Sequence, residues 1–147
     1  MKAQRIVSGL ALAIFLTANA AAADGSLEHI HSVLKDARTQ GTAISASASA
    51  RISESLAEAL ASDHRGLETG ALRLVIAYGD VVSLNRTAVI EMVRLYRDDE
   101  DENVRQMAVV ALGAAGDEWG LDFLERSEAF EDVRRIRHTI RAVLAQS

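Results

Sequence analysis

The chain has 147 residues, with 16 lysines and arginines against 21 aspartates and glutamates, a formal net charge of −5, and neither cysteine nor proline. The absence of cysteine excludes disulfide scaffolds, thiolate metal sites and cysteine nucleophiles. With 49% hydrophobic and 25% charged residues, the composition is that of one small folded domain. The negative charge argues against nucleic-acid binding, which needs a basic surface to neutralise phosphates.

Residues 1–23 have the three parts of an export signal. Lys2 and Arg5 form a short positive region, an apolar run follows over 6–16, and a stretch of small residues then offers cleavage positions. The apolar run is shorter than the roughly 20 residues of a membrane span, so an uncleaved anchor is the weaker alternative. We predict cleavage near Ala20 to Ala23, and a periplasmic or secreted protein with no stable membrane span after cleavage.

Removal of this signal leaves residues 24–147, with 14 basic and 21 acidic side chains and a formal charge of −7. An exported chain without disulfides depends on its apolar core, and a domain of this size buries about two-thirds of its unfolded surface. Apolar residues recur at helical spacing almost throughout, and no segment has the pattern of a strand flanked by turns. The expected fold is a single all-α domain.

Two helices are predicted within residues 26–62. The apolar positions of the first are Leu27, Ile30, Leu34 and Ala37, and it ends near Gly41. Those of the second are Ile52, Leu56, Ala59 and Leu60, and it ends before Asp63. The serines and alanines of 42–50 alternate as in a strand, but they carry little apolar surface, so we predict a loop feeding the second helix.

A repeated apolar spacing begins at Leu67. Residues at i, i+4, i+7, i+8 and i+11 are apolar from Leu67, again from Val104, 37 residues later, and in large part from Ile136, after a further 32. The first two copies end in Gly79-Asp80 and Gly116-Asp117, which predicts a helix stop followed by the cap of the next helix. The apolar positions of those next helices are Ala88, Val89, Met92, Val93 and Tyr96, and then Leu121, Phe123 and Leu124.

An even spacing of 32 residues is the rival alignment. It brings Arg73, Arg105 and Arg137 into register but moves Asp80 onto the core position of Leu112. Burial of an unpaired carboxylate costs several kcal/mol, whereas an arginine shared on a solvated face contributes at most about 1 kcal/mol. The spacing of 37 and then 32 is therefore preferred, with the extra length assigned to a longer second helix in the first unit.

The segment from Asp99 to Gly113 has an acidic turn, the pair Val104-Arg105, and an alanine-rich helix that closes on Ala-Leu-Gly. It resembles the short bacterial HEAT-type repeats also found in phycobilin lyases. A weaker copy starts at Glu131, and the resemblance covers residues 66–146. It implies a short α-α solenoid of HEAT-like helix pairs, capped at the N-terminus by helices within 26–62, of a kind that usually binds other proteins.

Two departures from the repeat pattern stand out. Glu68 lies where the family would have an arginine, and the last unit is one helix with no partner after it. Terminal units of solenoids need a polar outer face. In the last helix the polar side chains that supply this face are Arg134, Arg137, His138 and Arg141.

Three groups of residues could suggest chemistry, and each favours a structural interpretation. His29 and His31, beside Glu28, point about 200° apart on a helix and cannot share a metal ion. His64 lies in a polar turn with no nucleophile in a recognisable setting. The run Asp98–Glu102 lacks the glycine and glutamate of a calcium loop and is suited to the N-terminus of a helix. The sequence predicts no catalytic residue, no metal site and no cofactor.

The expected function is a non-catalytic, secreted or periplasmic protein–protein interaction module whose protein partner is not identified. The residues predicted to contact it are Arg105, Trp119, Arg134, Arg137 and Arg141, which with Arg135 include the basic patch of the last helix. One alternative is a small-molecule carrier, or a lyase-like or chaperone-like protein, that binds a hydrophobic ligand between helices. Another is self-association, with the acidic run 98–102 of one copy against the basic last helix of the next.

Overall fold

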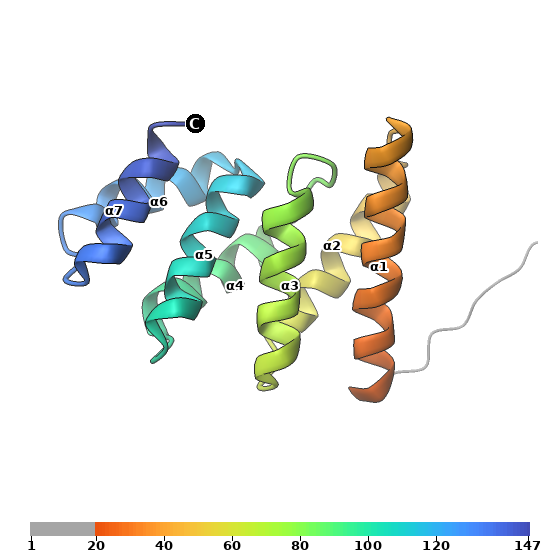
Figure 1. Ribbon diagram of the computed structural model, residues 1–147, viewed down its shortest axis with the longest axis horizontal. Helices are drawn as coiled ribbons and strands as arrows, with labels where there is room; N and C mark the ends of the chain where they lie inside the picture. Colours follow the sequence, from red (N-terminus) through yellow and green to blue (C-terminus); the bar gives the residue numbers. More distant parts are fainter. Residues whose placement is uncertain (1–19) are drawn as a thin grey trace, which may run out of the picture.

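The computed structural model describes residues 20–147, with side chains described from Ser26 onward. Over this range the chain forms seven α-helices and no strand (Figure 1). The helices are α1 (Ala20–Gln40), α2 (Ala46–Leu60), α3 (Arg65–Tyr78), α4 (Arg86–Asp98), α5 (Glu102–Ala115), α6 (Glu118–Glu128) and α7 (Arg134–Leu144). The predicted all-α class is confirmed. The predicted export signal, 1–23, falls almost wholly outside the described residues and stays a prediction.

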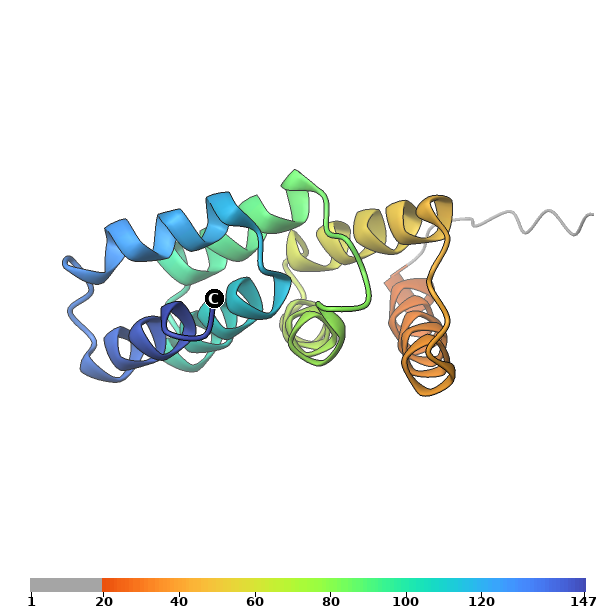
Figure 2. The same cartoon turned by 90° about the horizontal axis from the view of Figure 1, so that it is seen from above.

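The helices lie in two layers (Figure 2). One layer holds α1, α3, α5 and α7, each packed against the next, and the other holds α2, α4 and α6. Each helix packs only against helices that are one or two places away from it in chain order. This order is compatible with a short α-α solenoid.

The structure groups the helices into pairs differently from the sequence analysis. Across the two layers, the extensive contacts are α2 with α3, α4 with α5, and α6 with α7, whereas α3 and α4 scarcely touch. Three complete pairs therefore run from α2 to α7, and α1 is the helix left over. The last helix, which we expected to stand alone, is the second member of the pair α6–α7.

The predicted repeat spacing is confirmed, but its explanation is wrong. Helices α3, α5 and α7 begin at Arg65, Glu102 and Arg134, which are 37 and then 32 residues apart. The extra length lies mainly in the loop between α3 and α4, residues 79–85, because the loop between α5 and α6 has only residues 116–117. Helix α4 is longer than α6 by only two residues, 13 against 11.

Short polar side chains cap several helix starts. The Ser45 hydroxyl accepts a hydrogen bond from the backbone N–H three residues on, so α2 begins at Ala46, and the second half of the segment expected as a loop is helical. Gly116 ends α5 in the left-handed conformation, with φ of +63°, and the Asp117 carboxylate accepts the Gly120 N–H of α6 at 3.0 Å. The stop and cap predicted at Gly116-Asp117 are therefore confirmed.

The helix stop predicted at Gly79 is confirmed, because α3 ends at Tyr78 with Gly79 as its C-cap, but the cap predicted at Asp80 is wrong. Gly79 has an ordinary right-handed φ of −58°, and α4 is capped by Asn85, five residues after Asp80. Gly79 is needed for a different reason. A Cβ there would lie 2.7 Å from the carbonyl carbon of Ala114, so the missing side chain lets α3 and α5 approach.

The predicted apolar positions of α2, α3 and α4 are all buried, and they form the centre of a continuous core. Those that stay partly exposed belong to the other helices: Ala37, Ala115, Leu121, Phe123, Val143 and Leu144. Among residues 20–147, no helix is both long enough and apolar enough to span a bilayer.

Candidate functional site

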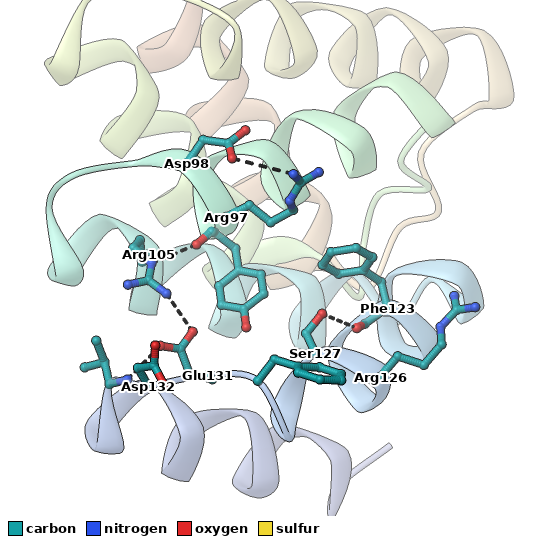
Figure 3. A pocket seen from close by; sticks show the side chains of 11 residues that line it. Arg97, Asp98, Arg105, Phe123, Arg126, Ser127, Glu131 and Asp132 are labelled. Atoms are coloured by element: carbon teal, nitrogen blue, oxygen red, sulfur yellow. Dashed lines mark hydrogen bonds and ion pairs between the residues drawn. The ribbon is translucent and has the colours of Figure 1, made fainter.

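An open groove of about 510 Å³ lies between the C-terminal end of α4, the second half of α6 and the loop that joins α6 to α7 (Figure 3). Aromatic side chains from each of these segments line it: Tyr96, Phe123 and Phe130. Three arginines and three carboxylates also line it: Arg97, Arg105, Arg126, Asp98, Glu131 and Asp132. The groove therefore has an apolar wall and a rim that carries both signs of charge.

A buried ion pair forms one side of the groove. The Glu131 carboxylate, only 2% exposed, accepts a hydrogen bond from Nη2 of Arg105 at 2.6 Å and another from the backbone N–H of Val133 at 2.9 Å. Nε of Arg105 donates to the carbonyl of Tyr96 at 2.9 Å. Arg105 thus joins the end of α4, the start of α5 and the α6–α7 loop, which is a structural role that the sequence did not indicate.

A second predicted residue meets the same loop position. Nε of Arg137 donates to the backbone carbonyl of Glu131 at 2.8 Å, so Arg105 and Arg137 converge on one residue, through its side chain and its main chain. Glu131 was missed as a site residue, because nothing in its sequence setting distinguishes a buried glutamate from an exposed one.

Three arginines along the stack donate to backbone carbonyls near helix ends. Arg94 of α4 donates to Leu60 at the end of α2, Arg105 of α5 to Tyr96 in the last turn of α4, and Arg137 of α7 to Glu131 in the loop after α6. Glu68 occupies the place in α3 that Arg105 occupies in α5, and α4 supplies Arg94, whose Nη2 lies 3.8 Å from Glu68 Oε1. The departure from the repeat pattern at Glu68 is thus an exchange of charges between two helices.

The phenol of Tyr96 faces this charged cluster. Burial, followed by the negative charge of Glu131, raises the pKa of Tyr96 to about 12. Its ring meets that of Phe123 edge-on, with centroids 6.2 Å apart and an interplanar angle of 83°. At neutral pH the Tyr96 phenol is therefore protonated, and its ring packs against Phe123 at the side of the groove.

Phe130 is the most exposed large hydrophobic residue among those described. It is 84% exposed, although it lines the same groove as Tyr96 and Phe123. Arg126, also on the rim, donates only to the Asp122 carbonyl at 3.2 Å, and neither it nor Asp132 forms an ion pair within the described chain. Phe130 lies in the short loop 129–133, where no helical periodicity marks a side chain as buried or exposed, so its exposure could not be predicted from the sequence.

Trp119 does not join the groove. It lies half-buried at the start of α6, with the Arg86 guanidinium 5.0 Å from its ring centroid and Phe123 at 6.1 Å. The geometry is a cation–π contact between α4 and α6.

The basic residues of α7 are spread over several contacts. Arg141 Nε lies 2.5 Å from Glu128 Oε1 of α6, and Arg135 reaches Glu102 at 3.6 Å and the Asn103 side chain at 3.1 Å. Arg134 is exposed and forms no ion pair with the described residues. The five residues predicted to contact a partner therefore do not converge on a single surface.

Of the histidines that could suggest metal or acid–base chemistry, His31 makes a contact between helices. His31 Nε2 lies 3.1 Å from the Tyr78 hydroxyl, which ties α1 to α3, while His29 is exposed, as is His64 just before α3. No group of three or more histidine or carboxylate side chains within the described part of the chain is arranged to hold a metal ion.

The acidic run 98–102 is mostly engaged within the chain. Asp99 pairs with Arg65 at 2.6 Å, and Asp101 caps α5 by accepting the Asn103 N–H at 2.8 Å. Desolvation alone would raise the pKa of Asp99, but the hydrogen bonds from Arg65 and from the Asp101 N–H hold that pKa below its ordinary value. These contacts leave few of its carboxylates for a second copy.

Compared with known protein families, curated proteins and solved structures, the chain matches none of them. The function is therefore argued from the groove itself.

Proposed function

We propose that this protein is an exported, non-catalytic protein-interaction module built from HEAT-like helix pairs, and that the groove beside the α6–α7 loop is its binding surface. The observation that carries the proposal is Phe130, which is 84% exposed and lines the same groove as Tyr96 and Phe123. Full burial of such a side chain in a partner contributes about 1.5–3 kcal/mol. Aromatic residues and arginine are also the residue types enriched in protein interfaces.

The groove supports this function better than the predicted set of arginines does. Arg105 and Arg137 donate to the main chain and to a buried carboxylate, so they shape the groove from within. Arg97 and Arg126 lie on its rim, where they are available to a partner. Arg134 and Arg141 on α7, and Trp119 on α6, remain candidates for a second contact area.

The experiment is site-specific crosslinking in the native cell envelope. A photoreactive amino acid at position 130 should yield a discrete protein adduct. The matched control is the same amino acid at position 90 on α4, because Ile90, at 46%, is the other exposed large hydrophobic residue among the described side chains. Adducts that are no stronger at 130 than at 90 would contradict the proposal.

The protein recovered from the cell envelope for the crosslinking experiment also tests export. We propose processing near Ala20 to Ala23, so the mass of the protein recovered from the periplasm or medium should correspond to a chain that begins there. Recovery of the unprocessed chain from the cytoplasm would contradict this part of the proposal.

A second groove favours the alternative function, a carrier of a hydrophobic small molecule. It measures about 500 Å³ and lies where the ends of α3, α5 and α7 meet the start of α6. Its lining residues, among them Ile76, Val110 and Val143, include no charged side chain. The carrier function would be supported if the protein binds a lipid or an apolar dye and Val110→Glu abolishes this binding while Ile90→Glu does not. Equal binding by both variants would contradict the carrier function.

A further inference from the structure

We infer that the groove beside the α6–α7 loop is self-complementary, and that its occupant is a second copy of this chain, with Phe130 of each copy inserted into the groove of the other. The inference rests on the proposed function, because it names the partner of the same surface. Three features of the groove support it.

The first feature is that a projecting side chain and a space to receive one belong to the same patch. In a two-fold symmetric dimer the same surface of both subunits meets, so this surface must carry both halves of every contact. Phe130 lines the rim but is 84% exposed, so its ring leaves most of the groove open. The half-buried ring of Phe123 offers an aromatic surface of the kind that a phenylalanine ring prefers, and the buried ring of Tyr96 packs edge-on against it.

The second feature is a pair of opposite charges with no partner inside the described chain. Arg126 and Asp132 both line the groove, both are exposed, and neither is within ion-pair distance of an opposite charge. A two-fold axis through the groove places Arg126 of one copy opposite Asp132 of the other, and the same pair then forms twice.

The third feature is the balance of charge. The groove is lined by equal numbers of arginines and carboxylates, although the whole chain has a formal charge of −5. Arg105 pairs with Glu131 and Arg97 with Asp98 inside the chain, so one charge of each sign, Arg126 and Asp132, is left for a partner. A uniformly acidic or basic partner would oppose one of these two charges, whereas a second copy satisfies both signs. This arrangement differs from pairing of the acidic run 98–102 with α7, because Asp99 and Glu102 already pair with Arg65 and Arg135.

The test measures dimer dissociation by sedimentation equilibrium, on protein purified in its naturally processed form. Phe130→Ala should raise the dimer dissociation constant about thirtyfold, as loss of a central aromatic anchor does. Ile90→Ala, the matched control on the outer face of α4, should leave it unchanged. Circular dichroism checks that each variant keeps its helices, which we expect because both side chains are exposed.

Charge exchange provides the decisive comparison. Arg126→Asp and Asp132→Arg should each raise the dissociation constant about tenfold, because each places like charges opposite one another at two symmetric positions. The double variant should restore most of the affinity, since the pair is then reformed with reversed signs. Arg73→Asp on α3, an exposed arginine outside the groove, is the control for a change in net charge.

The inference would be supported if each single charge exchange weakens the dimer and the double exchange restores it. A monomer at all concentrations, or a dimer indifferent to the groove variants, would overturn it. In those cases an adduct at position 130 with a different protein would leave the proposed function intact, and the absence of any adduct there would overturn both.

Discussion

Glu131→Ala should lower the free energy of unfolding by about 3 kcal/mol. The variant loses a hydrogen bond between charged groups, worth about 1.5–3 kcal/mol, and the bond from the Val133 N–H, worth about 0.5–1.5 kcal/mol. The substitution also leaves the Arg105 guanidinium without the carboxylate that it pairs with. Because the Arg105 side chain is 20% exposed, water recovers part of that cost, and the total stays near the lower end of the range for a broken buried pair.

The assay is urea and thermal unfolding of Glu131→Ala, Arg105→Met and the double variant. For a domain of this size 1 kcal/mol corresponds to roughly 4 °C, so the Tm of Glu131→Ala should fall by about 12 °C. The double variant should be more stable than the sum of the single losses predicts, with a coupling energy of about 2 kcal/mol.

The control is the pair Arg141 and Glu128, whose side chains are 58% and 27% exposed. Its coupling energy should not exceed about 1 kcal/mol, as for other surface pairs. A coupling for Arg105 and Glu131 no larger than that of the control would refute the reasoning. Arg105 would then return to the set of residues available to a partner.

Three further predictions concern pH and packing. Asp99→Asn should destabilise the protein above about pH 4, and the difference from the parent should vanish as the pH falls through the depressed pKa of Asp99, because protonation also ends its pairing with Arg65. With the other tyrosine replaced by phenylalanine, ultraviolet titration should place the pKa of Tyr96 near 12, and stability should decline as the pH rises from about 10 towards that value. Gly79→Ala should cost about 3 kcal/mol in chemical unfolding, since backbone must move, against about 1 kcal/mol for Gly116→Ala, where only φ is unfavourable.

Each of these has an outcome that would contradict it. A pH-independent effect of Asp99→Asn would mean that its carboxylate is not tied to Arg65. Titration of Tyr96 near pH 10 in the folded protein would mean that its phenol is solvated. A loss at Gly79→Ala no greater than at Gly116→Ala would mean that α3 and α5 have room for a methyl group.

Apolar spacing was sufficient to locate most helices. The spacing from Leu67, Val104 and Ile136 correctly predicted three helices that share a layer, because one face of each is buried and a buried face must repeat every 3.6 residues. Burial of Asp80 was the argument against even spacing, and the structure leaves Asp80 exposed in a loop, where it pairs with Arg38.

The grouping into pairs and the groove could not be obtained in this way. Each helix of the stack has neighbours on both sides, and periodicity indicates which face is buried but not which neighbour covers it. Glu131 and Phe130 are adjacent in one loop, yet the carboxylate is buried and the ring is exposed. That inversion depends on Arg105, 26 residues earlier in the chain, whose guanidinium draws the carboxylate inward.

Contacts restricted to near neighbours in the stack have a consequence for how the molecule opens. Helix α1 packs against α2 and α3, so its detachment removes these two contacts and leaves the three complete pairs assembled. Stability in such an array is a sum of local terms, and a fluctuation at one end is not felt at the other. Amide hydrogen exchange should therefore be graded along the chain, with α1 exchanging through partial opening and the central helices α3 and α5 only through larger excursions.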